Sequence, residues 1–391
     1  MILKNGTVMM PDGDFFRTDL LIKGRIISGF SSNAYEADIF DLTGCRILPG
    51  LIDIHNHGYR GHYTLDPDPN SLRALAAELA SEGVTSFLPT TTAASLKDLK
   101  ACLYRLKHFC TEENDGAVAR GIYMEGPFLS LDYKGAMIES NMLNPDISLI
   151  DNFMKVAGGF LKIISLAPEL PEAEDAIHFC VKNGIIPSIA HTASDYEIAR
   201  RAISAGADHI THLFNAMADP KHREPGVMGA LLDSVATAEI ICDGHHVHPS
   251  FVRMMFHLLG DERMILISDD TPISGLGDGK FVMDGVTSIV KDGVCRLENG
   301  TINGNVQPLL YCVLKATELG IPFASAVKMA TSAPAKRIGI FSETGSIEVG
   351  KNADLLVLDY NNLVKMTVVR GKPVYVCNEW KRDKLQTERW S

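Results

Sequence analysis

The chain lacks the features by which several classes of protein are recognised. Its eight cysteines include no pair with C-x-x-C spacing, which argues against a disulfide framework and for reduced thiols. No apolar run reaches the ~20 residues that span a bilayer, and the first residues contain no cleavable signal segment. These absences predict a soluble, cytoplasmic protein with no membrane partner.

Basic residues are also in short supply. There are 37 Lys and Arg against 48 Asp and Glu, which gives a formal net charge of −11 at pH 7. This balance argues against nucleic acid as the main partner. No G-x-G-x-x-G turn follows an early strand, which argues against a dinucleotide-binding doubly wound sheet.

The sequence does contain a repeated alternation of β-rich runs and helical segments. Eight β-rich runs end on polar or glycine residues, at 50–57, 84–92, 120–126, 160–169, 185–192, 209–215, 238–246 and 264–270. Helical spacing lies between them, with a cap expected at Asn70 or Ser71 for one helix and at Ser194 or Asp195 for another. Eight such units predict an α/β fold of the (β/α)₈ TIM-type barrel, whose chemistry lies at the carboxyl ends of the strands.

The two chain ends follow a different pattern. Residues 1–49 and 344–391 contain short strands separated by turn residues. We expect these segments to pair into one small, discontinuous β-sandwich domain, interrupted by the barrel of residues 50–343.

Polar side chains stand where the predicted strands end. His55 and His57 close the first run, and residues two apart on a strand face the same side, so the two imidazoles project together. The other polar strand ends carry Glu125, His191, His212 and Asp269. Imidazoles and carboxylates at one rim suit a divalent cation, which lowers the pKa of bound water to about 7. Asp269 is then the expected base for that water.

Other titratable residues have simpler explanations. Asp270 is expected to be a loop or supporting residue rather than a catalyst. The histidines without a strand-end position are expected to lie on the surface or to pack in the interior; they are His62, His108, His178, His209, His222, His245, His248 and His257.

Several motifs resemble a known family. "PGLIDIHNHG" is similar to the opening signature of the amidohydrolase superfamily. "EGPF", "AHT", "THLFNAM", "HREPGVMGA", "DGHHVHP" and "GSIEVGKNADLLVLD" resemble the N-acetylglucosamine-6-phosphate deacetylases of that superfamily, over nearly the whole chain.

The resemblance implies a metal centre. Glu125, His191 and His212 match the ligands of the family's principal metal. His55 and His57 match the ligands of a second metal, and Glu125 would bridge the two. The resemblance implies one or two divalent ions, Zn²⁺ or Fe²⁺.

The resemblance also implies a reaction and a substrate site. Metal-bound hydroxide attacks the acetyl carbonyl of an N-acetylated amino-sugar phosphate, and Asp269 passes a proton to the leaving amine. The products are acetate and the amino-sugar phosphate. Residues implied in substrate binding are His246, which would also stabilise the oxyanion, Asn215, Ala216, Arg223, Ala136 and Met137. The family implies a homodimer with the phosphate pocket near the subunit interface.

Two departures from the family leave alternatives open. Met137 stands where the family has a substrate-contacting histidine, and "INGN" at 302–305 replaces an "LAGS"-like segment. N-acetylgalactosamine 6-phosphate therefore remains an alternative substrate.

Two other functions are further removed. A cyclic-amide hydrolase or base deaminase would be expected to end its fourth strand with a carboxylated lysine, whereas Lys162 lies near the start of that run. An inactive barrel that serves as a binding module would be expected to lose a ligand or the aspartate, and none is lost.

Overall fold

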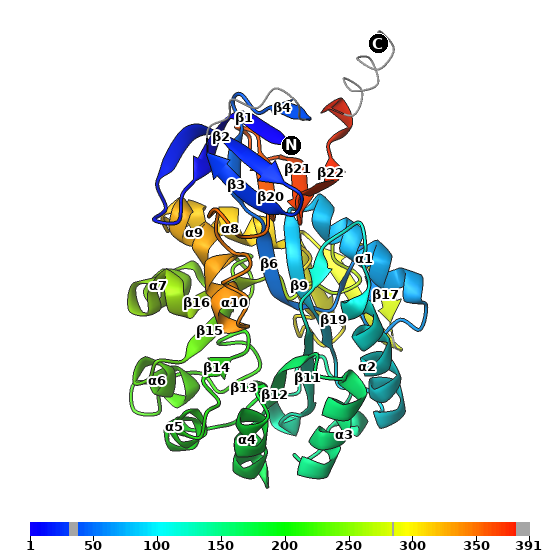
Figure 1. The fold of residues 1–391 in the computed structure, drawn as a ribbon. Coiled ribbons are helices and arrows are strands. Elements are labelled where there is room, and N and C mark those ends of the chain that lie inside the picture. The colour runs from blue at the N-terminus through cyan, green and yellow to red at the C-terminus, as the bar shows by residue number, and fades with distance from the viewer. Residues whose placement is uncertain (31–37, 284, 381–391) are drawn as a thin grey trace.

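The computed structural model describes residues 1–30, 38–283 and 285–380. In these residues a barrel of parallel strands lies below a sheet built from both chain ends (Figure 1). The barrel strands are β6 (Leu51–Asn56), β9 (Val84–Thr91), β11 (Ile122–Phe128), β12 (Leu161–Leu166), β13 (Ile186–Ile189), β14 (His209–Ile210), β15 (Thr237–Ile241) and β16 (Met264–Ile267). All eight lie within the predicted runs or overlap them, so the barrel prediction is confirmed.

The barrel closes where its first and last strands meet. From β6 to β16 each strand pairs in parallel with the next. At the carboxyl ends of β6 and β16, the Asp269 N–H donates to the His55 carbonyl at 3.0 Å, and the His57 N–H donates to the Asp270 carbonyl at 2.8 Å. Closure thus brings the first predicted ligands beside the predicted catalytic aspartate.

Side chains alternate between the barrel interior and the layer beneath the helices. On β11, Tyr123 packs in the interior cluster, whereas Met124 packs in the outer core. Within the interior, the Tyr123 hydroxyl lies 2.6 Å from Thr211 Oγ1, and Ser165 Oγ donates to that hydroxyl at 3.1 Å. Tyr123 precedes Glu125 by two residues and Thr211 precedes His212 by one, so this polar network lies beneath the site residues.

Helices surround the barrel, and the last of them also packs against its interior cluster through Ala333 and Ala335. They are α1 (Pro69–Ser81), α2 (Leu96–Thr111), α3 (Ile147–Ala157), α4 (Ala173–Lys182), α5 (Tyr196–Ser204), α6 (Gly226–Leu232), α7 (Pro249–Arg263), α8 (Leu309–Glu318), α9 (Phe323–Met329) and α10 (Ser332–Arg337). Among the described residues, no helix has the length and apolarity needed to cross a membrane.

The N-cap residue differs from the predicted one in α1 and agrees with a predicted one in α5. The cap expected for α1 was wrong: Asp68, rather than Asn70 or Ser71, accepts from the Asn70 N–H at 2.9 Å. A carboxylate two residues before that amide reaches it from an extended backbone. For α5, Asp195 accepts from the Ile198 N–H at 2.8 Å, as one of the two expected caps.

Strands from both chain ends form one sheet in the order β22-β21-β20-β5-β1-β2-β3, and β4 also pairs with β1. Its members are β1 (Ile2–Met9), β2 (Phe15–Lys23), β3 (Ile26–Phe30), β4 (Ile39–Asp41), β5 (Arg46–Pro49), β20 (Leu355–Leu358), β21 (Val364–Val369) and β22 (Lys372–Val376). Because β5 pairs antiparallel with β20, the two ends join as expected. The domain boundaries at 49/50 and 343/344 stay predictions, and residues 31–37 and 381–391 lie outside the described residues.

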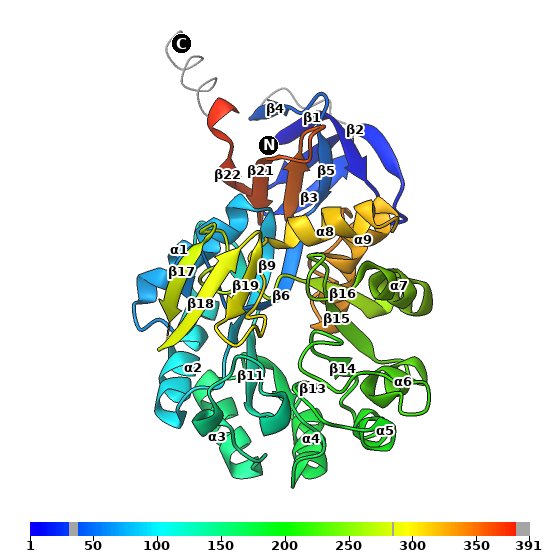
Figure 2. The ribbon, with the colours of Figure 1, turned by 180° about the vertical axis from the view of Figure 1, so that it is seen from behind.

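A small sheet between β16 and α8 was not foreseen from the sequence. It consists of β17 (Gly279–Met283), β18 (Val286–Lys291) and β19 (Val294–Leu297), and it lies on the side of α1 and β9 (Figure 2). Shorter elements complete the fold: β7 (Gly58–Tyr59), β8 (His62–Tyr63) and β10 (Val118–Ala119).

Candidate metal centre and active site

Six predicted site residues converge at the carboxyl ends of the barrel strands. His55 belongs to β6 and Glu125 to β11, whereas His57, His191, His212 and Asp269 lie one to two residues beyond β6, β13, β14 and β16. The backbone is unusual at several of these ends. His191, His212 and Asp269 have φ of 42°, 27° and 54°, a region that residues with a side chain seldom adopt. Strain of this kind clusters at functional sites.

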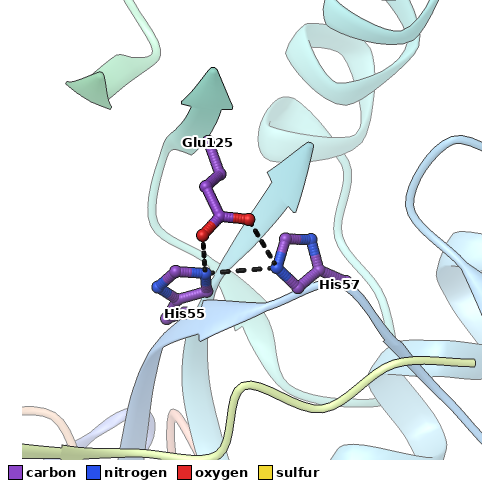
Figure 3. A group of neighbouring side chains, drawn as sticks. All are labelled: His55, His57 and Glu125. Atoms are coloured by element: carbon purple, nitrogen blue, oxygen red, sulfur yellow. Dashed lines mark hydrogen bonds and ion pairs between the residues drawn. The ribbon is translucent and has the colours of Figure 1, made fainter. Parts of the chain in front are cut away.

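Glu125 lies at the centre of the group. One carboxylate oxygen, Oε1, lies 3.6 Å from His55 Nε2, and Oε2 lies 3.4 Å from His57 Nε2 (Figure 3). Oε1 also lies 3.3 Å from His191 Nε2 and 2.8 Å from His212 Nε2. Two triads suited to a metal ion therefore share Glu125: one with His55 and His57, the other with His191 and His212.

Asp269 faces the first triad. Its Oδ1 lies 3.5 Å from His55 Nε2 and 3.4 Å from His57 Nε2. Its neighbour Asp270 is buried and belongs to neither triad, and burial and the charge of Asp53 raise the pKa of its carboxyl well above the usual range. The choice of Asp269 rather than Asp270 as the catalytic aspartate stays a prediction.

The imidazoles and carboxylates of the site shift one another's pKa values. Burial disfavours the imidazolium of His57, but hydrogen bonds to Asp269 and Glu125 outweigh burial and raise its pKa to about 10. Burial opposes ionisation of Glu125, but the charge of His55 and hydrogen bonds from His191 and His212 hold its pKa well below the usual range. Burial also opposes ionisation of Asp269, but a hydrogen bond from His57 and the charges of His55 and His57 lower its pKa.

The donor set fits a divalent cation. Four imidazole nitrogens and a carboxylate in a buried pocket are the nitrogen and oxygen ligands that zinc and iron(II) accept. The Nδ1 atoms of His57 and His212 are buried and have no hydrogen-bond partner among the residues that the structure describes. The Nε2 atoms of both rings are the nitrogens that converge on Glu125.

The site also contains residues that the sequence analysis did not single out. Glu239 on β15 is fully buried and accepts from His55 Nδ1 at 2.9 Å. His209, expected only to pack, lies 3.1 Å from the same carboxylate. The sequence signal for Glu239 was an acid at an inward position of an apolar strand, a position that is costly to bury without a partner.

A second buried carboxylate holds His246. Asp243 Oδ2 lies 2.7 Å from His246 Nδ1, and its Oδ1 accepts from the backbone N–H groups of His245 and His246 at 2.8 and 2.9 Å. His246 also lines the cavity in front of the metal triads, so its Nε2 edge is the one left for a ligand.

The cavity has a volume of about 1110 Å³ and reaches most of the residues predicted to bind substrate. Its walls include Asn215, Ala216, Ala136 and Met137. Arg223 is different: it is exposed, lies outside the cavity wall, and its Nη1 donates to His222 Nε2 at 2.6 Å. The single chain does not bring Arg223 to the other predicted substrate residues.

The two segments that depart from the family pattern both line this cavity. Met137 Sδ accepts from the Ala93 N–H at 3.5 Å, which holds the "KGAM" turn beside the loop after β9. Residues 302–304 form another wall, and the Asn305 N–H donates to the Asp269 carbonyl at 3.0 Å. Both departures therefore alter walls of the cavity and leave the ligands unchanged.

The remaining histidines lie apart from the triads. Each is exposed or half-buried and belongs to neither group of ligands; they are His62, His108, His178, His222, His245, His248 and His257. Lys162 is the second residue of β12, so among the described residues it is not at the carboxyl end of the fourth strand.

A family model and several curated proteins match most of this chain. A model of the amidohydrolase family matches residues 46–374. The N-acetylglucosamine-6-phosphate deacetylase of Bacillus subtilis is 32% identical over 97% of this chain and 95% of its own length. The N-acetylgalactosamine-6-phosphate deacetylase of Escherichia coli O157:H7 is 34% identical over 83% of this chain and 87% of its own.

Solved structures agree with the sequence comparison. The N-acetylglucosamine-6-phosphate deacetylase of Pasteurella multocida superposes with a TM-score of 0.90 at 30% identity, covering 96% of this chain and 99% of that one. A variant of the Mycobacterium smegmatis enzyme, solved in complex with N-acetyl-D-glucosamine-6-phosphate, gives a TM-score of 0.89 at 29% identity over the same shares of the two chains.

Proposed function

Because this chain belongs to the amidohydrolase family, we propose that it is a metal-dependent hydrolase of the acetamide of N-acetyl-D-glucosamine 6-phosphate. The products are D-glucosamine 6-phosphate and acetate. Relatives and solved structures that carry this activity in their names match nearly the whole chain. The observation that carries the proposal is the convergence of four imidazoles on Glu125, with Asp269 against His55 and His57, at a cavity that Glu125 and Asp269 line.

The ligands for the ions follow from the two triads. Glu125, His191 and His212 would hold one ion, and His55 and His57 would hold a second one with Glu125 between them. The ions would be Zn²⁺ or Fe²⁺, because both accept imidazole and carboxylate. A bound ion supplies an activated water near pH 7 and polarises a carbonyl.

Asp269 is the residue placed to move the proton. It is ionised, because His55 and His57 lower its pKa against the effect of burial. Its carboxylate can therefore accept a proton from the attacking water and return it to the amine nitrogen as the C–N bond breaks. The nitrogen then leaves as a neutral amine and the carboxylate of Asp269 is restored, so the proton taken from water is the proton given to the nitrogen.

His246, Asn215 and Ala216 define the sugar-phosphate end of the cavity in this proposal. The hydrogen bond with Asp243 holds the His246 ring in one orientation before substrate binds, so Nε2 is already positioned to contact the substrate. We propose that Arg223 serves the 6-phosphate only where a second subunit completes the pocket, since it is exposed on the isolated chain. The homodimer and a cytoplasmic location stay predictions.

A second candidate is the galacto epimer of the substrate. The walls formed by Met137 and by residues 302–304 differ from the family pattern, and they lie where the cavity would contact the sugar. A relative named for N-acetylgalactosamine 6-phosphate is 34% identical to this chain. Discrimination between the epimers depends on one hydroxyl, so it depends on these walls rather than on the ligands.

Acetate release from three compounds tests the function. The metal-loaded protein is assayed with N-acetyl-D-glucosamine 6-phosphate, its galacto epimer and unphosphorylated N-acetylglucosamine. We expect turnover that requires the 6-phosphate, and the ratio of kcat/KM for the two phosphorylated sugars identifies the preferred epimer. No acetate from any of the three compounds, with metal bound, would refute the proposal.

Replacement of Asp269 tests the mechanism. Asp269→Asn keeps the side-chain shape but cannot accept the proton, so we expect kcat to fall by about 10²–10⁴-fold. Asp66→Asn is the control, because Asp66 lines the same cavity but its carboxylate accepts from the Asp68 N–H in a loop. Equal activity of Asp269→Asn and the wild type would exclude the proposed proton transfer.

A further inference from the structure

Glu239 is a buried acid for which the proposed reaction has no direct use. It lies on β15, its side chain is fully buried, and it belongs to neither metal triad. The ring nitrogens of His55 and His209 and the backbone N–H of His212 lie against its two oxygens. A carboxylate can accept a hydrogen bond from each of these groups.

The first accepted bond fixes the ring of His55. His55 Nδ1 lies 2.9 Å from Glu239 Oε2, so Nδ1 carries the proton. The lone pair of the neutral imidazole is then on Nε2, the atom that faces Glu125, His57 and Asp269. Without such an acceptor the proton could occupy Nε2 instead, and His55 could not bind a metal through that atom.

The same carboxylate holds the end of a different strand. Glu239 Oε2 also accepts from the His212 backbone N–H at 3.1 Å. The Glu239 carbonyl accepts from the Leu213 N–H at 2.9 Å. Because His212 has the strained φ of 27° and belongs to the second triad, Glu239 stabilises the backbone that carries one ligand while it orients the side chain of another.

The other oxygen of Glu239 is fixed from behind. His209 Nε2 lies 3.1 Å from Glu239 Oε1, and His209 Nδ1 lies 2.7 Å from Thr237 Oγ1. His209, Glu239 and His55 are fully buried and Thr237 is half-buried. The chain of contacts Thr237–His209–Glu239–His55 ends at the metal centre. Both carboxylate oxygens are therefore occupied, and the side chain has one orientation.

We propose that Glu239 is the positioning residue that makes the centre able to hold two ions. It sets the tautomer of His55 through its side chain, whereas it reaches the His212 triad only through a backbone N–H. Loss of its charge should therefore weaken the ion at His55 and His57 more than the ion at His191 and His212. This inference rests on the proposed metal dependence, but it concerns metal binding rather than substrate.

Metal stoichiometry and affinity test the inference. Wild type and Glu239→Gln are loaded with Zn²⁺, dialysed, and analysed for zinc per chain, and each affinity is then measured by competition with a chelator. We expect two ions per chain in the wild type. In Glu239→Gln we expect about one ion per chain, with the weaker site about 10–100-fold weaker than in the wild type. Circular dichroism shows whether both proteins are folded.

Further variants keep the test decisive. Glu239→Asp retains the charge but withdraws the oxygens from His55, so it should give an intermediate loss even if Glu239→Gln does not fold. Glu112→Gln is the matched control, because it makes the same exchange at a carboxylate whose exposed ion pair with Arg73 lies outside both triads. Two ions bound with unchanged affinity in Glu239→Asp, or a single ion in the wild type, would overturn the inference. Neither result would alter acetate release by the wild type, so the proposed function is judged separately.

Discussion

Two histidines of the site, His55 and His246, each place Nδ1 against a buried carboxylate. The Nε2 atom of His55 then faces Glu125, whereas His246 lines the cavity. The partner of His55 is Glu239, and that of His246 is Asp243. Carboxylates in such positions fix both the tautomer and the orientation of the ring. At the scale of single residues, the precision of this site therefore depends on acids that would not contact the substrate.

Replacement of Asp243 tests this for His246. In Asp243→Asn the amide can turn its NH₂ toward Nδ1, which moves the imidazole proton to Nε2 and reverses the role of that atom. We expect kcat/KM for the phosphorylated sugar to fall at least about tenfold, while zinc content stays that of the wild type.

The control for this variant is His245→Ala. The exposed side chain of His245 is removed, whereas its backbone N–H still donates to Asp243. A kcat/KM for Asp243→Asn equal to that of His245→Ala would show that the orientation of His246 has no role in turnover.

The sequence predicts that the metal ligands lie together, but it does not predict which buried acid orients them. His55, His57, Glu125, His191 and His212 stand at or just beyond strand ends, and a barrel brings strand ends together. Glu239 stands within a strand between Ala238 and Ile240, so the sequence does not show which side chain receives its charge. That depends on which neighbouring strands place His55 and His209 against it, which is tertiary information.

At the scale of elements, the segment after β19 controls the position of Asp269. The Asn305 N–H donates to the Asp269 carbonyl at 3.0 Å. Gly304 has φ of +62°, and a Cβ there would lie 2.3 Å from Thr271 Cγ2 and 3.0 Å from the Asp269 carbonyl oxygen. No side chain fits at this position unless the loop that carries the aspartate moves.

Gly304→Ala should therefore reduce activity. We expect kcat to fall at least about tenfold, because a displacement of about 1 Å near reacting groups can cost 10²-fold. Gly300→Ala is the matched control: Gly300 has φ of +90°, so its substitution strains the backbone as well, but nothing lies within 4 Å of the added Cβ. Equal kcat values for the two variants would attribute any loss to backbone strain alone.

Strands with a clear apolar run could be predicted from the sequence. A helix start with several suitable cap residues, and short strands with weak hydrophobic alternation, could not. The eight barrel strands follow from apolar runs that end on polar residues. The cap of α1 was misjudged because Asp68, Asn70 and Ser71 all suit a helix start, and only the backbone geometry selects one of them. The sheet of β17 to β19 was missed because its strands are short and its side chains are largely half-buried or exposed, so hydrophobic alternation is weak.

At the scale of the whole molecule, Arg120 connects the barrel to the sheet from the chain ends. It lies just before β11, its side chain is only 6% exposed, and Nη2 lies 3.2 Å from Asp354 Oδ2, which is fully buried. Asp354 also accepts from the Arg370 N–H at 2.6 Å. The ion pair thus neutralises a charge buried between the two parts of the chain.

Removal of this arginine should destabilise the protein. Arg120→Ala leaves the Asp354 carboxylate buried without its cation, so we expect a loss of about 3–5 kcal/mol in the free energy of unfolding, measured by urea denaturation. Arg73→Ala removes an exposed pair with Glu112 and should cost less than about 1 kcal/mol. A small and equal loss for both variants would contradict this role of Arg120.

The pairing of β5 with β20 also has a consequence for biosynthesis. Leu48 pairs with Leu356, on the order of 300 residues later in the chain. At the usual ~5–20 residues per second of translation, β5 leaves the ribosome roughly 15–60 seconds before its partner is made. Throughout that interval β5 can pair with β1 on one side, but its other edge has no partner. Chaperone binding to the nascent chain should therefore peak while the barrel is synthesised and end once β20 emerges.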